Sequence, residues 1–282
     1  MNPLRLLLLV GLAAVAAPSA AQHEDHAPKS AEPADPHAHH APVAAPVIPR
    51  PSDADRAAAF PDLGGMTADA HMAAGPRWRV LADRLEWQDA DEGDAFAWDL
   101  EGWFGGDFDR VWLRTEGQHE HDGTRGADLQ LLYGHAFARW WELVAGVRHD
   151  TGPGPSRDWM AVGVQGLAPY MFDVEATAYM GGAGRTALRL EAVHELRLTS
   201  RLVLQPQLEL ELYGKDDPET RVGSGLSQAE AGLRLRYELR RELAPYLGVV
   251  WQRRFGDTAD FARAAGDGDH DTRLVAGVRV WF

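Results

Sequence analysis

Histidine side chains, which borderline metal ions favour as ligands, gather in the segment that precedes residue 76. The members of this set are His23, His26, His37, His39, His40 and His71. Acidic side chains lie among the first five of them, and carboxylates add Coulomb attraction to imidazoles that close around an ion. The pattern predicts binding of copper(II), nickel or zinc. The alternative is a solvated linker in which the histidines bind nothing.

Methionine sulfur narrows the choice of metal. Met66 and Met72 flank His71 in the stretch GGMTADAHMAA. A thioether is chosen mainly by copper(I), and the chain has no cysteine that could supply a competing thiolate. The sequence therefore favours copper. The absence of cysteine also excludes disulfides, cysteine–zinc sites and thiol nucleophiles.

A second group of candidate ligands falls in an expected external loop and consists of His119, Glu120, His121 and Asp122. Residues two apart share a face of an extended chain, so His119 and His121 could hold one ion. Loops rich in His and Asp are often simply solvated, and a solvated loop is the alternative here. Interface or structural roles are expected for the single histidines His135, His149 and His194.

The first residues predict an exported protein. Arg5, an apolar run and the small residues before Gln22 form a cleaved signal peptide over residues 1–21, because the run is shorter than the roughly 20 apolar residues of a membrane helix. Residues 22–75 are dense in Ala and Pro and bury too little apolar surface to offset their ordering entropy, so we expect a disordered tail.

The 282-residue chain has a formal charge of -14, which repels polyanions and argues against nucleic acid as a partner.

A single β domain is expected over residues 76–282. From about Val80 the sequence alternates between apolar and polar side chains, as strands with two different faces do. Leu208 and Leu210, for example, fall on one side of their segment, and Glu209 and Glu211 fall on the other. About twelve such segments occur, each of roughly the ten residues that a tilted strand needs to cross a bilayer. They begin near residues 80, 96, 108, 127, 141, 159, 171, 185, 202, 227, 245 and 272.

These features predict an all-β fold, an antiparallel outer-membrane β-barrel of about 12 strands, rather than a soluble sandwich. Short connections alternate with longer ones that are rich in Gly, Asp and Pro, such as GKDDPETRVGSGL and GDTADFARAAGDGDHD. The last segment, LVAGVRVWF, ends on an aromatic residue, Phe282, at the carboxyl terminus. Aromatic residues close to strand ends are expected to form girdles at the membrane interfaces. They are Trp98, Trp103, Tyr133, Trp140, Trp141, Trp159, Tyr170, Tyr213 and Tyr246.

The polar faces of the expected strands are strongly charged. Their carboxylates are Asp99, Glu101, Glu116, Asp128, Glu175, Glu191, Glu209, Glu211 and Glu230, and their cations are Arg110, Arg114, Arg189, Arg234, Arg236 and Arg279. Such a lumen could be an acidic path for cations. Structural ion pairs that fill a narrow barrel are the favoured interpretation.

Several segments resemble the copper resistance protein B family of outer-membrane proteins. They are PDLGGM (61–66), ADRLEWQ (82–88), WDLEGWFGGDFDRVWLRTEG (98–117), VGVQGLAPYMFDVEATAYMG (162–181), GRTALRLEA (184–192), LYGKDDPE (212–219), GSGLSQAEAGLRLRYELRRELAPYLGVVW (223–251) and the closing DTRLVAGVRVWF. The resemblance covers nearly everything after Phe60. It implies a copper-binding outer-membrane barrel in a periplasmic copper detoxification system, working beside a secreted multicopper oxidase. Family tails look rich in paired Met and His, whereas this tail has only Met66 and Met72 before the barrel, which gives copper(II) capture by His more weight.

The expected function is an outer-membrane copper-binding protein of a Gram-negative cell, which contributes to copper resistance by sequestering copper ions or passing them between the periplasm and the outside. An even strand count returns both termini to the periplasmic side, so the tail is expected in the periplasm, with membrane lipid and copper as partners.

The alternatives are a passive cation-selective porin and an outer-membrane hydrolase. Interior side chains can largely fill a barrel of about twelve strands, which argues against a wide channel. An enzyme is not expected, because neither Ser156 nor Ser224 lies in a G-x-S-x-G context and alternate carboxylates such as Glu209 and Glu211 need no catalytic explanation.

Overall fold

The computed structural model describes residues 50–59, 75–90, 93–120, 123–152 and 154–282. The chain divides into two compact units, Met1–Asp62 and Leu63–Phe282. The expected signal peptide (1–21) and all but a short part of the expected tail (22–75) lie outside the described residues.

The described part of the first unit contains a short helix, α1 (Asp53–Ala59), none of whose residues is buried. Ser52 and Asp55 form a capping box: the Asp55 N–H donates to Ser52 Oγ at 3.1 Å, and the Ser52 N–H donates to the Asp55 carboxylate at 2.8 Å. The helix lies within residues 22–75, where a disordered tail is expected, and its capping favours the first turn of a helix without any packing.

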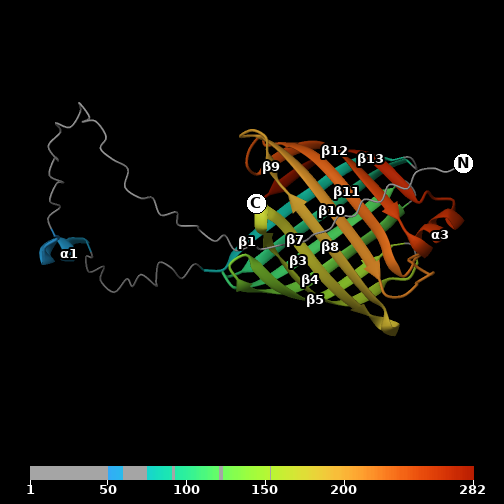
Figure 1. Cartoon of the computed structure of the whole chain (residues 1–282), viewed down its shortest axis with the longest axis horizontal. Helices are drawn as coiled ribbons and strands as arrows, with labels where there is room; N and C mark the ends of the chain where they lie inside the picture. The colour runs from blue at the N-terminus through green and yellow to red at the C-terminus, as the bar shows by residue number, and fades with distance from the viewer. Residues whose placement is uncertain (1–49, 60–74, 91–92, 121–122, 153) are drawn as a thin grey trace, which may run out of the picture. The chain divides into compact units, whose positions relative to one another are not determined.

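The second unit is a closed antiparallel β-barrel (Figure 1). Its strands are β1 (Arg77–Ala90), β2 (Gly93–Gly105), β3 (Asp109–Glu120), β4 (Gly123–Ala138), β5 (Trp141–Thr151), β6 (Arg157–Ala168), β7 (Phe172–Gly181), β8 (Thr186–His194), β9 (Leu196–Arg197), β10 (Leu202–Tyr213), β11 (Gly225–Tyr237), β12 (Leu243–Arg254) and β13 (His270–Trp281). Consecutive strands pair along the chain, and β13 pairs with β1 to close the barrel. Both β8 and β9 pair with β10, so they form one interrupted strand, and the described residues build a twelve-strand barrel. The predicted fold class is confirmed.

Side chains alternate between the lumen and the outer surface, as the period-two pattern predicts. In β5, Val144 is fully buried, whereas Leu143 and Val147 are 49% and 54% exposed. In β4, Leu132 is 1% exposed and its neighbour Leu131 is 51% exposed. A closed barrel pairs its backbone polar groups between strands, so this exposed apolar belt is the surface that the hydrocarbon core of a bilayer requires.

The two ends of the barrel differ in their connections. At one end, the turn rim, the connections are short and comprise residues 106–108, 139–140, 169–171, 198–201 and 238–242. The opposite end, the loop rim, carries two long connections, residues 214–224 and 255–269, beside shorter ones such as residues 152–156 and 182–185. β1 begins and β13 ends at the turn rim, where the Val80 N–H donates to the Phe282 carbonyl at 3.1 Å and the Phe282 N–H donates to the Val80 carbonyl at 2.9 Å. The first and last strands therefore meet at the turn rim.

One connection on the loop rim contains a helix that the sequence did not predict. α3 (Gly256–Ala265) ends before Gly266, whose φ of 93° is left-handed and suits glycine. Thr258 of α3 is buried; its Oγ1 accepts the Gly223 N–H and contacts the Ser227 hydroxyl, both at 2.8 Å. The helix has several alanines, which favour helix, and its buried residues Thr258, Ala259 and Ala262 add packing, with contacts to β11. No helix of the described residues is both long and apolar enough to cross a membrane.

The aromatic girdles differ from the expected ones. Four of the expected girdle residues face the lumen: Trp103, Trp159, Tyr213 and Tyr246. The prediction is wrong for these four because closeness to a strand end does not decide the face, which the alternation alone decides. Exposed aromatic side chains gather on the turn rim, where two of the expected girdle residues, Trp140 and Tyr170, do lie. Others at this rim are Trp78, Phe104, Phe108 and Phe137.

Candidate functional site

Most of the metal ligands predicted from sequence lie outside the described residues, namely His23, His26, His37, His39, His40, Met66, His71, Met72 and His121. His119 is described; it is exposed and lies near the end of β3. It pairs with Thr124, and Glu120 pairs with Gly123, so the β3–β4 ladder continues almost to the tip of the hairpin. The expected external loop is therefore wrong for His119 and Glu120, because backbone pairing extends through these polar residues.

The described residues contain no group of three or more His, Asp or Glu side chains that could hold a metal ion. Apart from His119, each described histidine directs Nδ1 toward one acceptor: His135 toward Asp109 (2.8 Å), His149 toward Asp158 (2.6 Å), His194 toward the Met171 carbonyl (3.1 Å) and His270 toward Asp269 (2.8 Å). Charged groups converge instead in the lumen.

Strand register places the lumen carboxylates in two runs. The first ladder crosses β2 to β5 and consists of Asp99, Glu116, Asp128 and Asp150. Each member lies directly opposite the next in the antiparallel pairing. Side chains in such positions have Cβ atoms about 4.5–5.5 Å apart, so these carboxylates are immediate neighbours.

The second ladder crosses β7, β8, β10 and β11 and consists of Glu175, Glu191, Glu209 and Glu230. It climbs along the lumen, because barrel strands are tilted against the barrel axis. Glu175 lies near the turn-rim end of β7, whereas Glu230 lies in the half of β11 that is closer to the loop rim. Like charges directly opposite each other destabilise a sheet, so both ladders require compensating cations.

Two arginines supply this compensation by joining the ladders across the lumen. Arg84 lies 3.4 Å from Glu116 in the first ladder and 3.8 Å from Glu230 in the second. Arg189 donates to Glu116 from both terminal nitrogens, one of them at 2.7 Å, and its Nε lies 3.0 Å from Glu209. The ladders are therefore cross-linked into one network.

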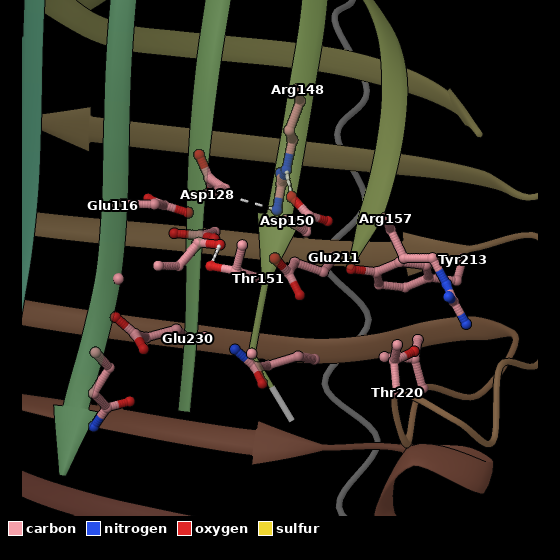
Figure 2. Close-up of a pocket in the computed structure, with 18 of the residues that line it drawn as sticks. Glu116, Asp128, Arg148, Asp150, Thr151, Arg157, Glu211, Tyr213, Thr220 and Glu230 are labelled. Carbon is pink, nitrogen blue, oxygen red and sulfur yellow. Dashed lines mark hydrogen bonds and ion pairs between the residues drawn. The ribbon is translucent and has the colours of Figure 1, made fainter. Parts of the chain in front are cut away.

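Arg148 neutralises the loop-rim end of the first ladder. Its guanidinium lies 3.3 Å from Asp128 and 2.5 Å from Asp150, and Figure 2 shows the two carboxylates on either side of it. The arginines that contact the ladders within the described residues are Arg84, Arg114, Arg148, Arg189 and Arg273, fewer than the carboxylates of the ladders. Glu191 accepts a hydrogen bond from the Gln207 amide at 2.7 Å. The ladders therefore contain more carboxyl groups than the guanidinium groups that contact them.

Further ion pairs fill the rest of the lumen. Arg234 donates twice to Glu86, at 2.9 and 3.0 Å, and the two side chains are 3% and 0% exposed. The Tyr246 hydroxyl also donates to Glu86, at 3.0 Å. Toward the turn rim, Arg236 lies 2.8 Å from Glu195. These contacts support the interpretation of the lumen charges as structural ion pairs.

A cavity of about 400 Å³ occupies the loop-rim side of the lumen. It extends from Lys215 and Thr220 in the 214–224 connection to Arg84 and Glu116 in the ladder network. Figure 2 shows Glu116, Glu230 and Thr220 around this space. The cavity thus ends at an arginine that bridges the ladders.

The 214–224 connection is held at the cavity by Asp217. Arg157 donates to the Asp217 carboxylate from Nε at 2.9 Å and from Nη2 at 3.1 Å, and Arg185 Nε lies 2.7 Å from it. The hydrogen bonds from Arg157 lower the pKa of Asp217 below its ordinary value, since they stabilise the charged form. The anchoring carboxylate is therefore ionised at neutral pH.

Sequence reasoning found most of the ladder carboxylates but missed Asp150 and three of the arginines that contact the ladders, Arg84, Arg148 and Arg273. Arg84 follows a register shift within residues 82–85 of β1, which interrupts the alternation that reveals lumen positions. Arg110 was expected opposite the carboxylates; it lies instead over the Trp103 ring, with Cζ 4.7 Å from the ring centroid. Asp83 and Arg84 are adjacent charged residues, which interrupts the apolar–polar alternation of β1. This interruption is the sequence signal that could have pointed to Arg84.

Residues 76–282 match the sequence family described as copper resistance protein B precursor. The copper resistance protein B homolog of Pseudomonas syringae pv. tomato is 47% identical over 281 residues, which cover 98% of this chain and 94% of that protein. The copper resistance protein B of Escherichia coli is 48% identical over 235 residues, which cover 83% of this chain and 78% of that protein. Among solved structures, the KdgM porin matches with a TM-score of 0.45 and 12% identity, over 72% of this chain and 98% of the porin.

Proposed function

The chain belongs to the copper resistance protein B family, and from this premise we propose that it acts in the outer membrane, sequestering copper ions or passing them between the periplasm and the outside. The observation that carries the proposal is the pair of carboxylate ladders, which follow the lumen wall next to a cavity at the loop rim. Successive carboxylates offer a cation several weak positions, and a path that must release its ion needs weak positions rather than one tight site.

Arg84 and Arg189 are the resident counter-ions of the ladders in this proposal. A copper ion that enters the cavity meets carboxylates, such as Glu116, that already hold a guanidinium. Binding therefore exchanges a guanidinium for the metal ion. Before the exchange, the same ion pairs fill the lumen, which argues against a wide open channel. This supports a protein that responds to copper over a passive cation-selective porin.

The tail is proposed to collect copper in the periplasm. Outer-membrane barrels turn their short connections toward the periplasm, and β1 begins at the turn rim. The signal peptide is proposed to end at residue 21, and the ligands that follow are His23, His26, His37, His39, His40, Met66, His71 and Met72. Together they raise the local concentration of copper at the barrel mouth. His119 and His121 are a second proposed capture site, at the loop rim, and a periplasmic multicopper oxidase is the proposed partner.

Copper is the cargo in this proposal, and the protein performs no chemistry of its own. Its relatives are named for resistance rather than for a reaction. The serines considered for a hydrolase, Ser156 and Ser224, both lie exposed on the loop rim. The Nδ1 atoms of His135, His149, His194 and His270 face acceptors other than these serines. Glu209, considered as an acid–base residue, belongs to the second ladder.

A deletion strain tests the proposal. Loss of the protein should raise sensitivity to copper, with little change for magnesium or for neutral solutes. Complementation by the double variant Glu191→Gln and Glu209→Gln should restore tolerance only in part, because it removes two neighbouring carboxylates of the second ladder. The matched control Glu238→Gln, whose partner Arg197 lies outside the ladders, should restore it fully.

Normal growth of the deletion strain in copper would contradict the proposal. If that strain had also lost a lipid- or peptide-hydrolysing activity at its surface, the hydrolase would be the better assignment. Equal complementation by the ladder variant and by wild type would remove the lumen from the mechanism and leave the tail as the copper-binding part.

A further inference from the structure

The connection between β6 and β7 has an unusual backbone. It is the short helix η1 (Pro169–Met171), in which Tyr170 and Met171 both have a φ of 64°. This left-handed conformation is unfavourable for side chains larger than those of Gly and Asn. Tyr170 and Met171 are 88% and 67% exposed, so packing does not hold their side chains there. A strained turn that presents two large side chains to its surroundings points to a function rather than to folding.

His194 lies beside this turn. It is the cross-strand partner of Phe172, and the two rings stack with centroids 4.6 Å apart. Its Nδ1 lies 3.1 Å from the Met171 carbonyl oxygen. A carbonyl can only accept, so in the neutral imidazole Nδ1 carries the proton and the Nε2 lone pair is available. Metal-binding histidines use the same arrangement, with one ring nitrogen donating to an oxygen and the other on the metal.

The residue that orients His194 also supplies a second kind of ligand. His135, His149 and His270 are oriented by aspartates, whereas His194 is oriented by the carbonyl of a methionine. His194, at the end of β8, is therefore held against the backbone of the residue that carries the thioether. A methionine side chain is unbranched and flexible, so its sulfur can approach an ion held by the ring. Copper(I) prefers soft sulfur ligands, and imidazole also suits copper.

We propose that Met171 and His194 form a copper(I) site on the turn rim. Phe172 fixes the plane of the imidazole, and the strained turn presents the thioether. The site deepens the proposed function and rests on it, because copper is taken as the ion that reaches this rim. β1 begins at the same rim, so copper collected by ligands that precede β1 meets the Met171–His194 site before it reaches the ladders.

The test uses the full-length protein in detergent with its other candidate ligands replaced. In this parent variant His23, His26, His37, His39, His40, His71, His119 and His121 become Ala, and Met66 and Met72 become Leu. It is titrated with copper(I) without oxygen, against a copper(I) chelator of known affinity. The parent should retain one copper(I) per chain. His194→Gln and Met171→Leu, each added to the parent, should weaken that binding about ten-fold or more.

Matched controls separate the site from any exposed His or Met. His149→Gln replaces another imidazole whose Nδ1 is held by an oxygen, and Met180→Leu replaces a methionine that is 51% exposed at the far end of β7. Both controls should leave copper(I) affinity unchanged. X-ray absorption of the copper-loaded parent should show a sulfur neighbour that Met171→Leu removes. Circular dichroism shows whether each variant keeps its strands.

Two results would overturn the site and remain distinguishable from failure of the proposed function. If the parent retains no copper(I) while the unmodified protein binds copper(I), the rim site is wrong and the replaced ligands, in the tail and at the loop rim, hold the copper(I). If the folded double variant Met171→Leu and His194→Gln keeps the copper(I) of the parent, the turn serves the membrane interface only. If the unmodified protein binds no copper in either oxidation state, both proposals fail.

Discussion

Replacing Arg189 with glutamine removes one of the two charges that join the carboxylate ladders. The Arg189 side chain is 9% exposed, with nitrogens 2.7 Å from Glu116 and 3.0 Å from Glu209. The substitution keeps a polar side chain of similar length but leaves these two carboxylates without that counter-ion. Arg84 remains as the other bridge, so the network should persist.

The size of the effect follows from Coulomb attraction. Two unit charges about 4 Å apart interact by about 4 kcal/mol at an effective dielectric constant of about 20. Arg84 continues to compensate Glu116, and the cavity admits water, so we take half of one such interaction, ~2 kcal/mol, as the gain for an entering cation. Since 1.4 kcal/mol corresponds to a factor of ten, copper(II) should bind the lumen about thirty-fold more tightly.

Two measurements on the purified protein check this prediction. Copper(II) titration should show the lower Kd, and the reversal potential in a planar bilayer under a salt gradient should shift toward cation selectivity. Arg236→Gln is the matched control, because Arg236 is 1% exposed and pairs with Glu195, outside the ladders. It should change neither quantity. A folded Arg189→Gln protein with unchanged copper affinity and unchanged or more anionic selectivity would refute the exchange of guanidinium for metal.

Three further predictions concern the stability and assembly of the barrel. Glu86→Gln should lower the free energy of unfolding by about 3–5 kcal/mol, because it leaves a buried guanidinium without its counter-charge; a loss under about 1 kcal/mol in denaturant unfolding would contradict this. The Asp217 anchor should hold above the ordinary carboxyl pKa of about 3.9 and be lost as pH falls through its lowered folded value, since protonation removes the charged acceptor. Protease cleavage within residues 214–224 should accordingly rise only below about pH 4, and Asp217→Asn should show raised cleavage at neutral pH. Deleting Phe282 should reduce the yield of barrel in outer-membrane fractions, because its backbone makes two hydrogen bonds to Val80 across the closing seam; an unchanged yield would argue that the seam closes without it.

Two segments that were expected to be loops have regular secondary structure instead. The His- and Asp-rich stretch at His119 reads as a loop, yet cross-strand hydrogen bonds continue through it to residue 120. The Gly- and Asp-rich stretch that contains α3 also has the composition of a loop. In the structure Thr258 of α3 is hydrogen-bonded to Gly223, just before β11, and contacts the Ser227 hydroxyl in β11. Residue composition could not predict either outcome. His119 is held in its strand by backbone pairing, which does not depend on the side chain. The partners of Thr258 lie more than 30 residues away in the sequence.

The sequence by itself determined which side of the barrel wall most side chains face. Leu208 and Glu209 must lie on opposite faces, because successive residues of a strand point in opposite directions and a slip of one residue would put leucines in the lumen. The same alternation predicted the strand number and the charged faces, whereas the choice of a barrel over a sandwich also needed the connections and the aromatic carboxyl terminus. It is a local argument, so it needs no knowledge of neighbouring strands.

Only the tertiary structure decided which charges meet. Glu175, Glu191, Glu209 and Glu230 are spread over four strands, and a slip of two residues between any pair would keep every face correct yet break the ladder. Register depends on turn geometry and on irregularities such as the shift in β1 that turns Arg84 toward both ladders. Alternation excludes slips by an odd number of residues but does not distinguish registers that differ by two. The ladders and their bridging arginines could therefore be identified only in the folded barrel.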